Sequence, residues 1–508
     1  MTDRVTKPRP RKKREAKTSP RAGAEGVSPK VEVVVKAEPD TPAPALALPV
    51  PLPPTRKPSV DREGARSELA ADEAITRIQQ HYRRPPLHLY QPSHAVPDAL
   101  DTAFISHFVQ QNNATRRFTP EVPWITHLPN LSGNNSKPAV RLSIRAASMA
   151  FFAVVHKDST ILVDSYRWYT MSLNCQRQSL ARIGANSIPD AEEILVPIIL
   201  SIYEAYAGTT TTSIWPHMAA AAKIIEMRGP TNCTGITSTL FKIMRVSDAH
   251  KAIIFNSPSV FASHEWMTVP WTIQTKSAHQ EIADIMLQIP ATIAMLDIEP
   301  GSLRRFFHQH LPFTARVEPV AARVHDWLRD LDIWAQRYPY LSKAPEGDIV
   351  VTADMTNLSS GVDVATNGEI VLPNSFIAFT AASYEALRLI LLLLLHKIMP
   401  KMAQSPMSAT SSMYPSPSSV SSPTSMPTDE ASIIDAATTA AQNVLTIARY
   451  QETTQQIGGF DVLRTVFPMV IVGSLGPRRE EKDRAVEMLT RWGRQRGISG
   501  LCAAWLQV

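Results

Sequence analysis

The sequence has few cysteines, and none of them lie close together. Cys175, Cys233 and Cys502 are the only three in 508 residues, and 58 and 269 positions separate them. A disulfide framework or a tetrahedral zinc site needs closely spaced cysteine or histidine ligands, so this spacing excludes disulfide-rich secreted domains and cysteine-held zinc modules. The N-terminus also lacks the apolar stretch of a signal peptide. We therefore expect an intracellular protein in a reducing compartment.

Recognisable catalytic and cofactor-binding motifs are also missing. The sequence has no glycine-rich phosphate loop, no Gly-x-Ser-x-Gly elbow and no His-Glu-x-x-His helix. His308 and His310 lie two residues apart, so on a helix they would point to different sides. Cys233 and His217 could act as nucleophile and base only if the fold brought them together, and the sequence offers no third residue to orient the histidine. We expect no enzymatic activity, no cofactor and no bound metal.

The net charge of +6 is concentrated at the N-terminus. Residues 1–36 hold 11 Lys and Arg against 4 Asp and Glu, a net of +7, so the other 472 residues carry about −1. A nearly neutral globular part has no overall field that attracts phosphate, so we expect only weak DNA contact, through the basic tail. The densest basic run is typical of a nuclear-import signal, with a plain solvated tail as the alternative, and it comprises Lys7, Arg9, Arg11, Lys12, Lys13 and Arg14. This run predicts a nuclear protein.

Two proline-rich stretches divide the chain. Residues 1–66 combine Pro, Ala, Val and charge without helical or strand periodicity, so we expect a disordered tail. Residues 401–429 form a Ser/Pro-rich segment with 10 serines between Ser405 and Ser425, which predicts a flexible loop and a target for phosphorylation. Helical periodicity resumes after this loop. The loop is therefore expected to interrupt a single domain that spans residues 83–508.

Between these stretches, apolar residues recur with the helical period. Asp190 and Glu193 predict a capping box and Gly208 predicts a helix end, with a kink at Pro197 between them. Further helices are expected over residues 97–111, 136–156, 215–228, 238–255, 277–297, 319–337, 374–399, 433–450 and 480–496. Short β-branched runs at 349–351 and 369–372 predict at most a small ribbon. The sequence thus predicts an all-α fold, a large irregular multi-helix domain.

One apolar segment needs a comparison with a membrane span. Residues 390–395 are a continuous aliphatic run, preceded by the apolar residues 376–379. Glu385 and Arg388 fall between the two, and charges at mid-span are costly in lipid. The segment is therefore interpreted as a central core helix, and no membrane association is expected.

Several short motifs follow one another in a specific order: Tyr203-Glu204, Trp215-x-His217, Met227-Arg228-Gly229-Pro230, and Arg245 after Leu240-Phe241. In this order and spacing they resemble the fungal-specific transcription factor domain, a helical region that in its family usually follows a binuclear zinc cluster. The resemblance covers roughly residues 98–505. Two positions depart from the family pattern, Pro197 in the Tyr-Glu helix and Gln176 where an apolar residue is usual. These two departures concern the packing around residues 176 and 197, which the resemblance does not predict.

The resemblance implies a nuclear transcriptional regulator that controls metabolic or secondary-metabolite genes through its helical domain. The family's zinc cluster needs six closely spaced cysteines, and none precedes Cys175 here, so DNA reading by that route is excluded. The implied partners are proteins of the transcription machinery or a DNA-binding relative, in a homo- or heterodimer. Two alternatives stay open. One is a truncated gene model, with the cysteines on an upstream exon, and the other is a helical scaffold, ligand-binding protein or enzyme without a recognisable motif.

Overall fold

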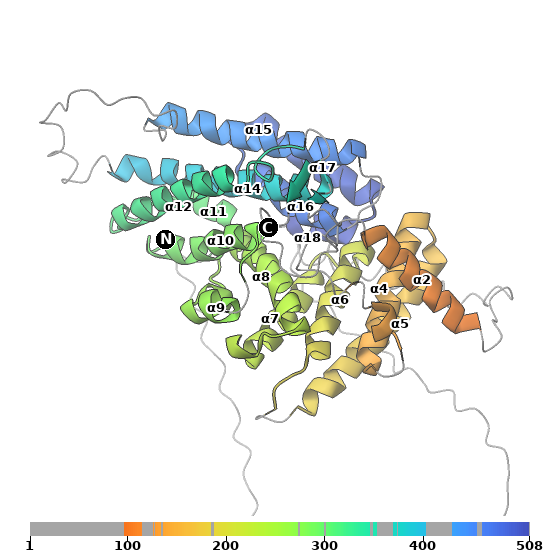
Figure 1. Ribbon diagram of the computed structural model, residues 1–508. Coiled ribbons are helices and arrows are strands. Elements are labelled where there is room, and N and C mark those ends of the chain that lie inside the picture. Colours follow the sequence, from red (N-terminus) through yellow and green to blue (C-terminus); the bar gives the residue numbers. More distant parts are fainter. Residues whose placement is uncertain are drawn as a thin grey trace, which may run out of the picture. The chain divides into compact units, whose positions relative to one another are not determined.

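A computed structural model describes most of the chain beyond residue 95. The described residues are 96–113, 125, 128–133, 136–183, 187–272, 275–298, 301–345, 349–352, 369–372, 374–402, 429–454 and 460–506. The predicted tail at 1–66, with its basic run, lies outside them, as do the start of the predicted domain at 83 and residues 403–428 of the predicted loop. Within the described part the fold is all-α with one short ribbon, as predicted (Figure 1).

The first half of the described chain consists of six helices of 15 residues or more and the four-residue helix α3. They are α2 (Val96–Asn113), α3 (Leu128–Leu131), α4 (Pro138–His156), α5 (Ser159–Ala181), α6 (Ala191–Ala207), α7 (Ile214–Arg228) and α8 (Ile236–Ile254). Helices α4 and α5 pack together through a tight connection. Lys157 adopts the left-handed conformation there, and the carboxylate of Asp158 caps α5 by accepting hydrogen bonds from the backbone of Thr160 and Ile161.

Helix α6 begins and ends as its sequence predicts. Asp190 and Glu193 form the capping box, and Gly208 ends the helix with a positive φ of 56°. The helix continues through Pro197, and the expected kink there stays a prediction. Gln176, the departure from the family pattern on α5, is buried and donates from Nε2 to the Glu193 carbonyl at 3.1 Å. The side-chain amide of Gln176 therefore joins α5 to α6 through a hydrogen bond.

The middle of the chain contains two long amphipathic helices, α10 (Ala278–Ala294) and α12 (Glu318–Arg337), and two short helices, α9 (His264–Thr268) and α11 (Leu303–His308). Three 3-10 turns connect them with α7 and α8: η2 (Pro230–Asn232), η3 (Val260–Ala262) and η4 (Val269–Trp271). Helix α10 lies between α8 and α12. Strands β1 (Ile349–Thr352) and β2 (Glu369–Leu372) then pair antiparallel, with Ile349 opposite Leu372, as the small predicted ribbon.

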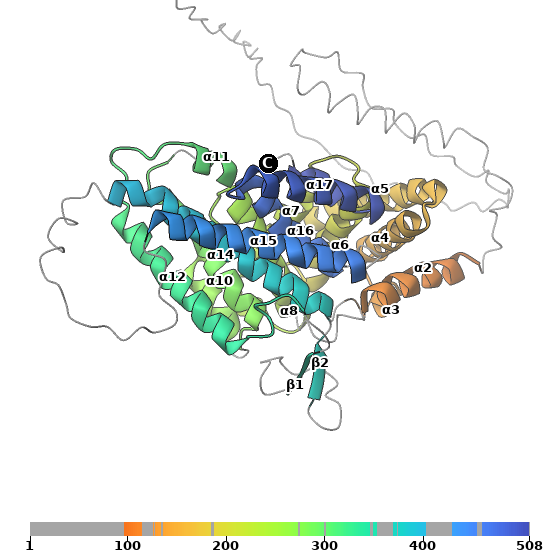
Figure 2. The same ribbon diagram turned by 90° about the horizontal axis from the view of Figure 1, so that it is seen from above.

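The last part of the chain contains the most buried long helix, α14, and four further helices. It consists of α14 (Asn374–Met402), α15 (Glu430–Thr454), α16 (Phe460–Leu475), α17 (Arg479–Gln495) and α18 (Ser499–Leu506). Figure 2 shows α14 and α15 running side by side, with α12 along the other flank of α14. Helix α14 includes Pro400 and ends at Met402, so the predicted loop start at 401 is two residues too early. Core contacts stabilise this extension, because Ile398 is completely buried and Met399 and Met402 pack, partly buried, against the core.

Two helices have the length and composition of a membrane span. They are α4 and residues 375–402 of α14, with mean hydropathies of 1.4 and 1.7, and 61% and 89% of their most apolar windows are buried inside the protein. From Ser375 to Leu395, Arg388 is the one side chain of α14 that is not classed as buried. This is the environment expected of a core helix, and it agrees with the interpretation of residues 390–395 made from the sequence.

Candidate functional site

The motif residues Tyr203, Glu204 and His217 meet where α5, α6 and α7 come together. Tyr169 on α5 has its hydroxyl 2.9 Å from Nε2 of His217, and its ring stacks on that of Tyr203 with centroids 4.5 Å apart. The carboxylate of Glu204 accepts hydrogen bonds from the backbone N–H and the hydroxyl of Thr209, at 3.0 and 2.7 Å. Tyr203 and Glu204 are each 1% exposed. We call Tyr169, Tyr203, Glu204 and His217 the Tyr-His cluster.

Burial decides the charge state of the Tyr-His cluster. It raises the pKa of Tyr169 far above its usual range, and the nearby carboxylate of Glu204 adds to this effect. Burial also lowers the pKa of His217, although Glu204 acts in the opposite direction. Both partners of the Tyr169–His217 hydrogen bond are therefore neutral near pH 7. The bond joins α5 to α7 without placing a charge in the core.

Trp215 connects α7 to the C-terminal helix. Its indole packs edge-on against Trp505 of α18, with ring centroids 4.3 Å apart, and against Phe255 at 5.3 Å. Helix α18 reaches this position because its first turn lies directly on the end of α6. A Cβ on Gly500 would stand 2.6 Å from the Cα of Gly208, so only glycine allows the two backbones to approach this closely.

The Arg228-Gly229-Pro230 motif ends α7. Gly229 has a φ of 77°, which favours glycine, and Pro230 begins the 3-10 turn η2. The guanidinium of Arg228 donates to the carbonyls of Pro189 and Asn232, and the Asn232 side chain donates back to the Arg228 carbonyl at 2.6 Å. The motif therefore ties the end of α7 to the segment that precedes α6.

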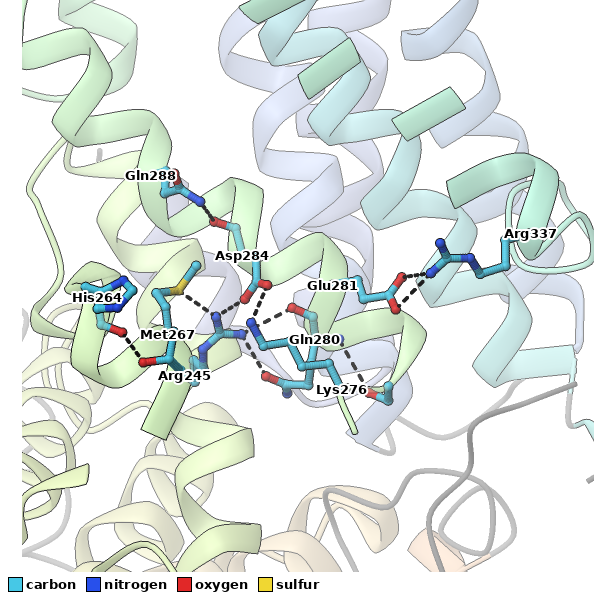
Figure 3. Close-up of polar contacts among 11 residues, drawn as sticks. Arg245, His264, Met267, Lys276, Gln280, Glu281, Asp284, Gln288 and Arg337 are labelled. Carbon is cyan, nitrogen blue, oxygen red and sulfur yellow. Dashed lines mark hydrogen bonds and ion pairs between the residues drawn. The ribbon is translucent and has the colours of Figure 1, made fainter. Parts of the chain in front are cut away.

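Arg245 on α8 is the centre of a second polar group, which we call the Arg245 cluster (Figure 3). Its side chain is fully buried. Nη1 donates to the carbonyl and side-chain oxygens of Gln280 at 3.2 and 3.0 Å, and Nη2 donates to Asp284 and to the sulfur of Met267. Lys276 makes an ion pair with the other carboxylate oxygen of Asp284 at 2.6 Å. A buried guanidinium needs this many partners to offset its desolvation.

Trp271 lies beside the Arg245 cluster and contacts its cations. The charged groups of Lys242, Arg245 and Lys276 stand 5.6, 5.4 and 5.5 Å from the centroid of its ring. Cations over an indole face are attracted by its quadrupole, and the attraction grows when water is excluded. Trp271 therefore adds a favourable electrostatic contact for these three cations, beside the carboxylate of Asp284.

The two alternative sites considered from the sequence take other roles. Burial raises the pKa of Cys233 to about 12, so its thiol is protonated near pH 7, and His217 is engaged with Tyr169. His308 is the last residue of α11 and His310 lies beyond it, so the two do not share a helix as the spacing argument assumed. Among the described residues, no group of three or more His, Cys, Asp or Glu side chains is placed to hold a metal ion.

Two sets of residues were missed by the sequence analysis. Gln280 and Asp284, two partners of Arg245, lie four residues apart on α10, and this polar pair on an otherwise apolar face was a signal that could have identified them. The second set is His250 and Arg464, which α8 and α16 bring to one cavity from distant parts of the chain. Positions 250 and 464 are far apart in the sequence, so no local sequence pattern could have predicted that they lie together.

Comparison with known proteins gives no match to a family model, to a curated protein or to a solved structure. The similarity to the fungal-specific transcription factor domain therefore depends on the motif residues described above.

Proposed function

We propose that the chain is a transcriptional regulator that acts in the nucleus through its helical domain and protein partners. The observation that carries this proposal is the use of the motif residues. Tyr203, Glu204, Trp215 and His217 are committed to contacts among α5, α6, α7 and α18, and Arg245 to contacts between α8 and α10. Such a pattern favours a packing scaffold whose function lies in what it binds. The polar groups of the motif residues are paired with other residues of the fold and are not arranged around an open site.

The proposed partners are proteins of the transcription machinery or a DNA-binding relative, in a homo- or heterodimer. DNA contact by this chain is proposed to be weak and confined to the basic tail. The proposed targets are metabolic or secondary-metabolite genes. A cytoplasmic scaffold is the competing function, and cellular location separates the two.

The first test uses a fluorescently tagged full-length chain in a fungal host. Replacing Lys7, Arg9, Arg11, Lys12, Lys13 and Arg14 with Gln should abolish nuclear accumulation, because import receptors read clustered positive charge. The matched control replaces Lys17, Arg21, Lys30 and Lys36 with Gln, which removes positive charge from the same tail but leaves the run intact. Unchanged nuclear accumulation after loss of the run would end its assignment as an import signal.

The second test asks whether the domain alters transcription. The full chain is fused to a heterologous DNA-binding domain and tethered upstream of a reporter gene. We expect a change in reporter output, in either direction, that is absent when the chain is expressed without the tether. A reporter indifferent to the tethered chain, together with a cytoplasmic location, would contradict the proposal. The genomic DNA before the start codon separately decides whether an upstream exon encodes the six cysteines.

A further inference from the structure

An exposed aromatic side chain lies beside the end of α14. Phe313 is 98% exposed, the highest value among the large apolar side chains of the described residues. It belongs to a turn that is closed by a hydrogen bond from the Ala315 N–H to the Pro312 carbonyl at 3.1 Å. Lys401 of α14 donates to the carbonyls of Pro312 and Phe313 and so holds the turn against the last turn of the helix. A phenylalanine kept in water by its own backbone gains nothing from burial, so its ring is available to a partner.

The chain around Phe313 is strongly basic. Residues 303–317 contain three arginines and no Asp or Glu. Lys397 and Lys401 lie beside them, and their ammonium groups donate to backbone carbonyls, which carry no net charge to oppose theirs. With Glu318 at the start of α12 counted, three arginines and two lysines against one carboxylate leave a net charge of +4. We call residues 303–318, Lys397 and Lys401 the Phe313 surface.

Two cations of the Phe313 surface lie close to the exposed ring. Arg316 is exposed and follows Phe313 by three residues, and the Nζ of Lys401 is 5.7 Å from the centroid of that ring. Among the described residues, neither Arg316 nor Lys401 forms an ion pair. The carboxylate of Glu430 at the start of α15 is paired with His396 at 3.0 Å. The two cations therefore suit an anion from outside the described residues.

The chain that follows α14 supplies an occupant of matching chemistry. Helix α14 ends at Met402, one residue after Lys401. Residues 403–428 come next, outside the described part, and they contain 10 serines, of which Ser405 is the first. Three residues of chain span at most about 11 Å, so a phosphate on Ser405 can reach Arg316 and Lys401. Ser405 also lies beyond the last turn of the helix, where the helix dipole would repel an anion.

We propose that the segment after α14 docks on the Phe313 surface when Ser405 is phosphorylated. The phosphate accepts hydrogen bonds from Arg316 and Lys401, and Pro406 packs on the exposed ring of Phe313. A phosphoserine carries nearly two negative charges at pH 7 and three strong acceptor oxygens, which an arginine and a lysine together can satisfy. This assignment goes beyond the proposed regulatory function and does not depend on it, because docking is measured on the purified chain.

The modification itself is a phosphoryl transfer from a nucleoside triphosphate, catalysed by a protein kinase. The Oγ of Ser405 forms a bond to the γ-phosphorus, and the bond from that phosphorus to the nucleoside diphosphate breaks. The hydroxyl proton passes to the base of the kinase, and the nucleoside diphosphate leaves.

Phosphorus NMR of the full-length chain, with phosphoserine incorporated at position 405 during translation, tests the proposal. The reference is a synthetic peptide of residues 397–410 that carries the same phosphoserine and both lysines but lacks residues 303–318. A free phosphoserine has a second pKa of about 6. Docking should lower this pKa to about 5 in the full-length chain, because nearby cations favour the dianion. Equal pKa values for the chain and the peptide would overturn the proposal.

Two variants locate the phosphate. Arg316→Gln should return the phosphoserine pKa at least about half of the way to the peptide value, since it removes one of the two cations. Arg479→Gln, at a side chain that is 93% exposed on α17, is the matched control and should leave the pKa unchanged. Arg316 is exposed, so its replacement is expected to preserve the fold. A low pKa that survives Arg316→Gln would place the phosphate elsewhere and refute the assignment.

Dilution and a third variant test the remaining parts of the proposal. Tenfold dilution should leave the phosphoserine pKa unchanged, because the segment and the surface belong to one chain. A pKa that rises on dilution would show docking on a second copy and contradict the proposal. Phe313→Ala should also raise the pKa, by less than Arg316→Gln does, since it removes the contact with Pro406 but no charge. An unchanged pKa in Phe313→Ala would refute that contact.

Discussion

Helix α8 carries two buried polar side chains five residues apart, Arg245 and His250, and the surrounding fold treats them differently. Arg245 is fully buried, and its guanidinium is met by Gln280, Asp284 and Met267. His250 is almost as buried, yet its Nε2 has no hydrogen-bond partner in the described chain, and its ring stacks on Phe467. The difference teaches that burial of polar groups alone does not show how they contribute to the fold. The state of their hydrogen bonds separates a polar cluster that joins two helices from a side chain held by packing.

The largest effect is expected where a charge loses its partner. Asp284→Asn leaves Arg245 buried without its carboxylate and removes the partner of Lys276, so the unfolding free energy should fall by about 3 kcal/mol. Chemical denaturation measures this change. Asp326→Asn removes an exposed ion pair with Arg329 and should cost less than about 1 kcal/mol. Similar losses for the two variants would remove the distinction between the Arg245 cluster and an ordinary surface pair.

The next effect tests how closely α18 packs on α6. Gly500→Ala puts a methyl group against the backbone of α6, so α18 must shift, at a cost of about 2 kcal/mol in unfolding free energy. Gly493→Ala is the control, since its Cβ meets its neighbours at 3.4 Å or more and replaces a helical glycine. Chemical denaturation compares the two variants, and equal stabilities would show that the close approach of α18 to α6 does not require glycine at position 500.

The smallest effect is a change in pH dependence. His250 has a folded pKa below the unfolded value of 6.5, so the unfolded chain takes up its proton first and stability falls as the pH drops below 6.5. The groups that face it, His279 on α10 and Arg464 on α16, reinforce this direction. His250→Phe should therefore flatten the decline of unfolding free energy between pH 6.5 and 5 by at most about 1.4 kcal/mol per pH unit. Parallel curves for the two proteins would mean that His250 does not titrate on unfolding.

Local signals predicted most of the helices, and distant contacts explain what was missed. The sequence predicted both ends of α6, the start from Asp190 and Glu193 and the end from Gly208, because capping depends on residues within one or two turns. The Tyr203-Glu204 and Trp215-x-His217 motifs were identified, but their contacts with Tyr169 and Trp505 depend on how α5 and α18 pack. His250 and Arg464 meet only in the folded chain, so no spacing rule could join them.

The central claim is that the partners of Arg245 hold α8 to α10, whereas the unpaired Nε2 of His250 contributes nothing to folding. Urea unfolding at pH 7 of the wild-type chain, Asp284→Asn and His250→Phe tests it most directly. Asp284→Asn should lose about 3 kcal/mol of unfolding free energy. His250→Phe should lose less than about 1 kcal/mol, since Phe preserves the ring stacked on Phe467 and removes an unpaired polar atom. Equal losses for the two variants would contradict the account.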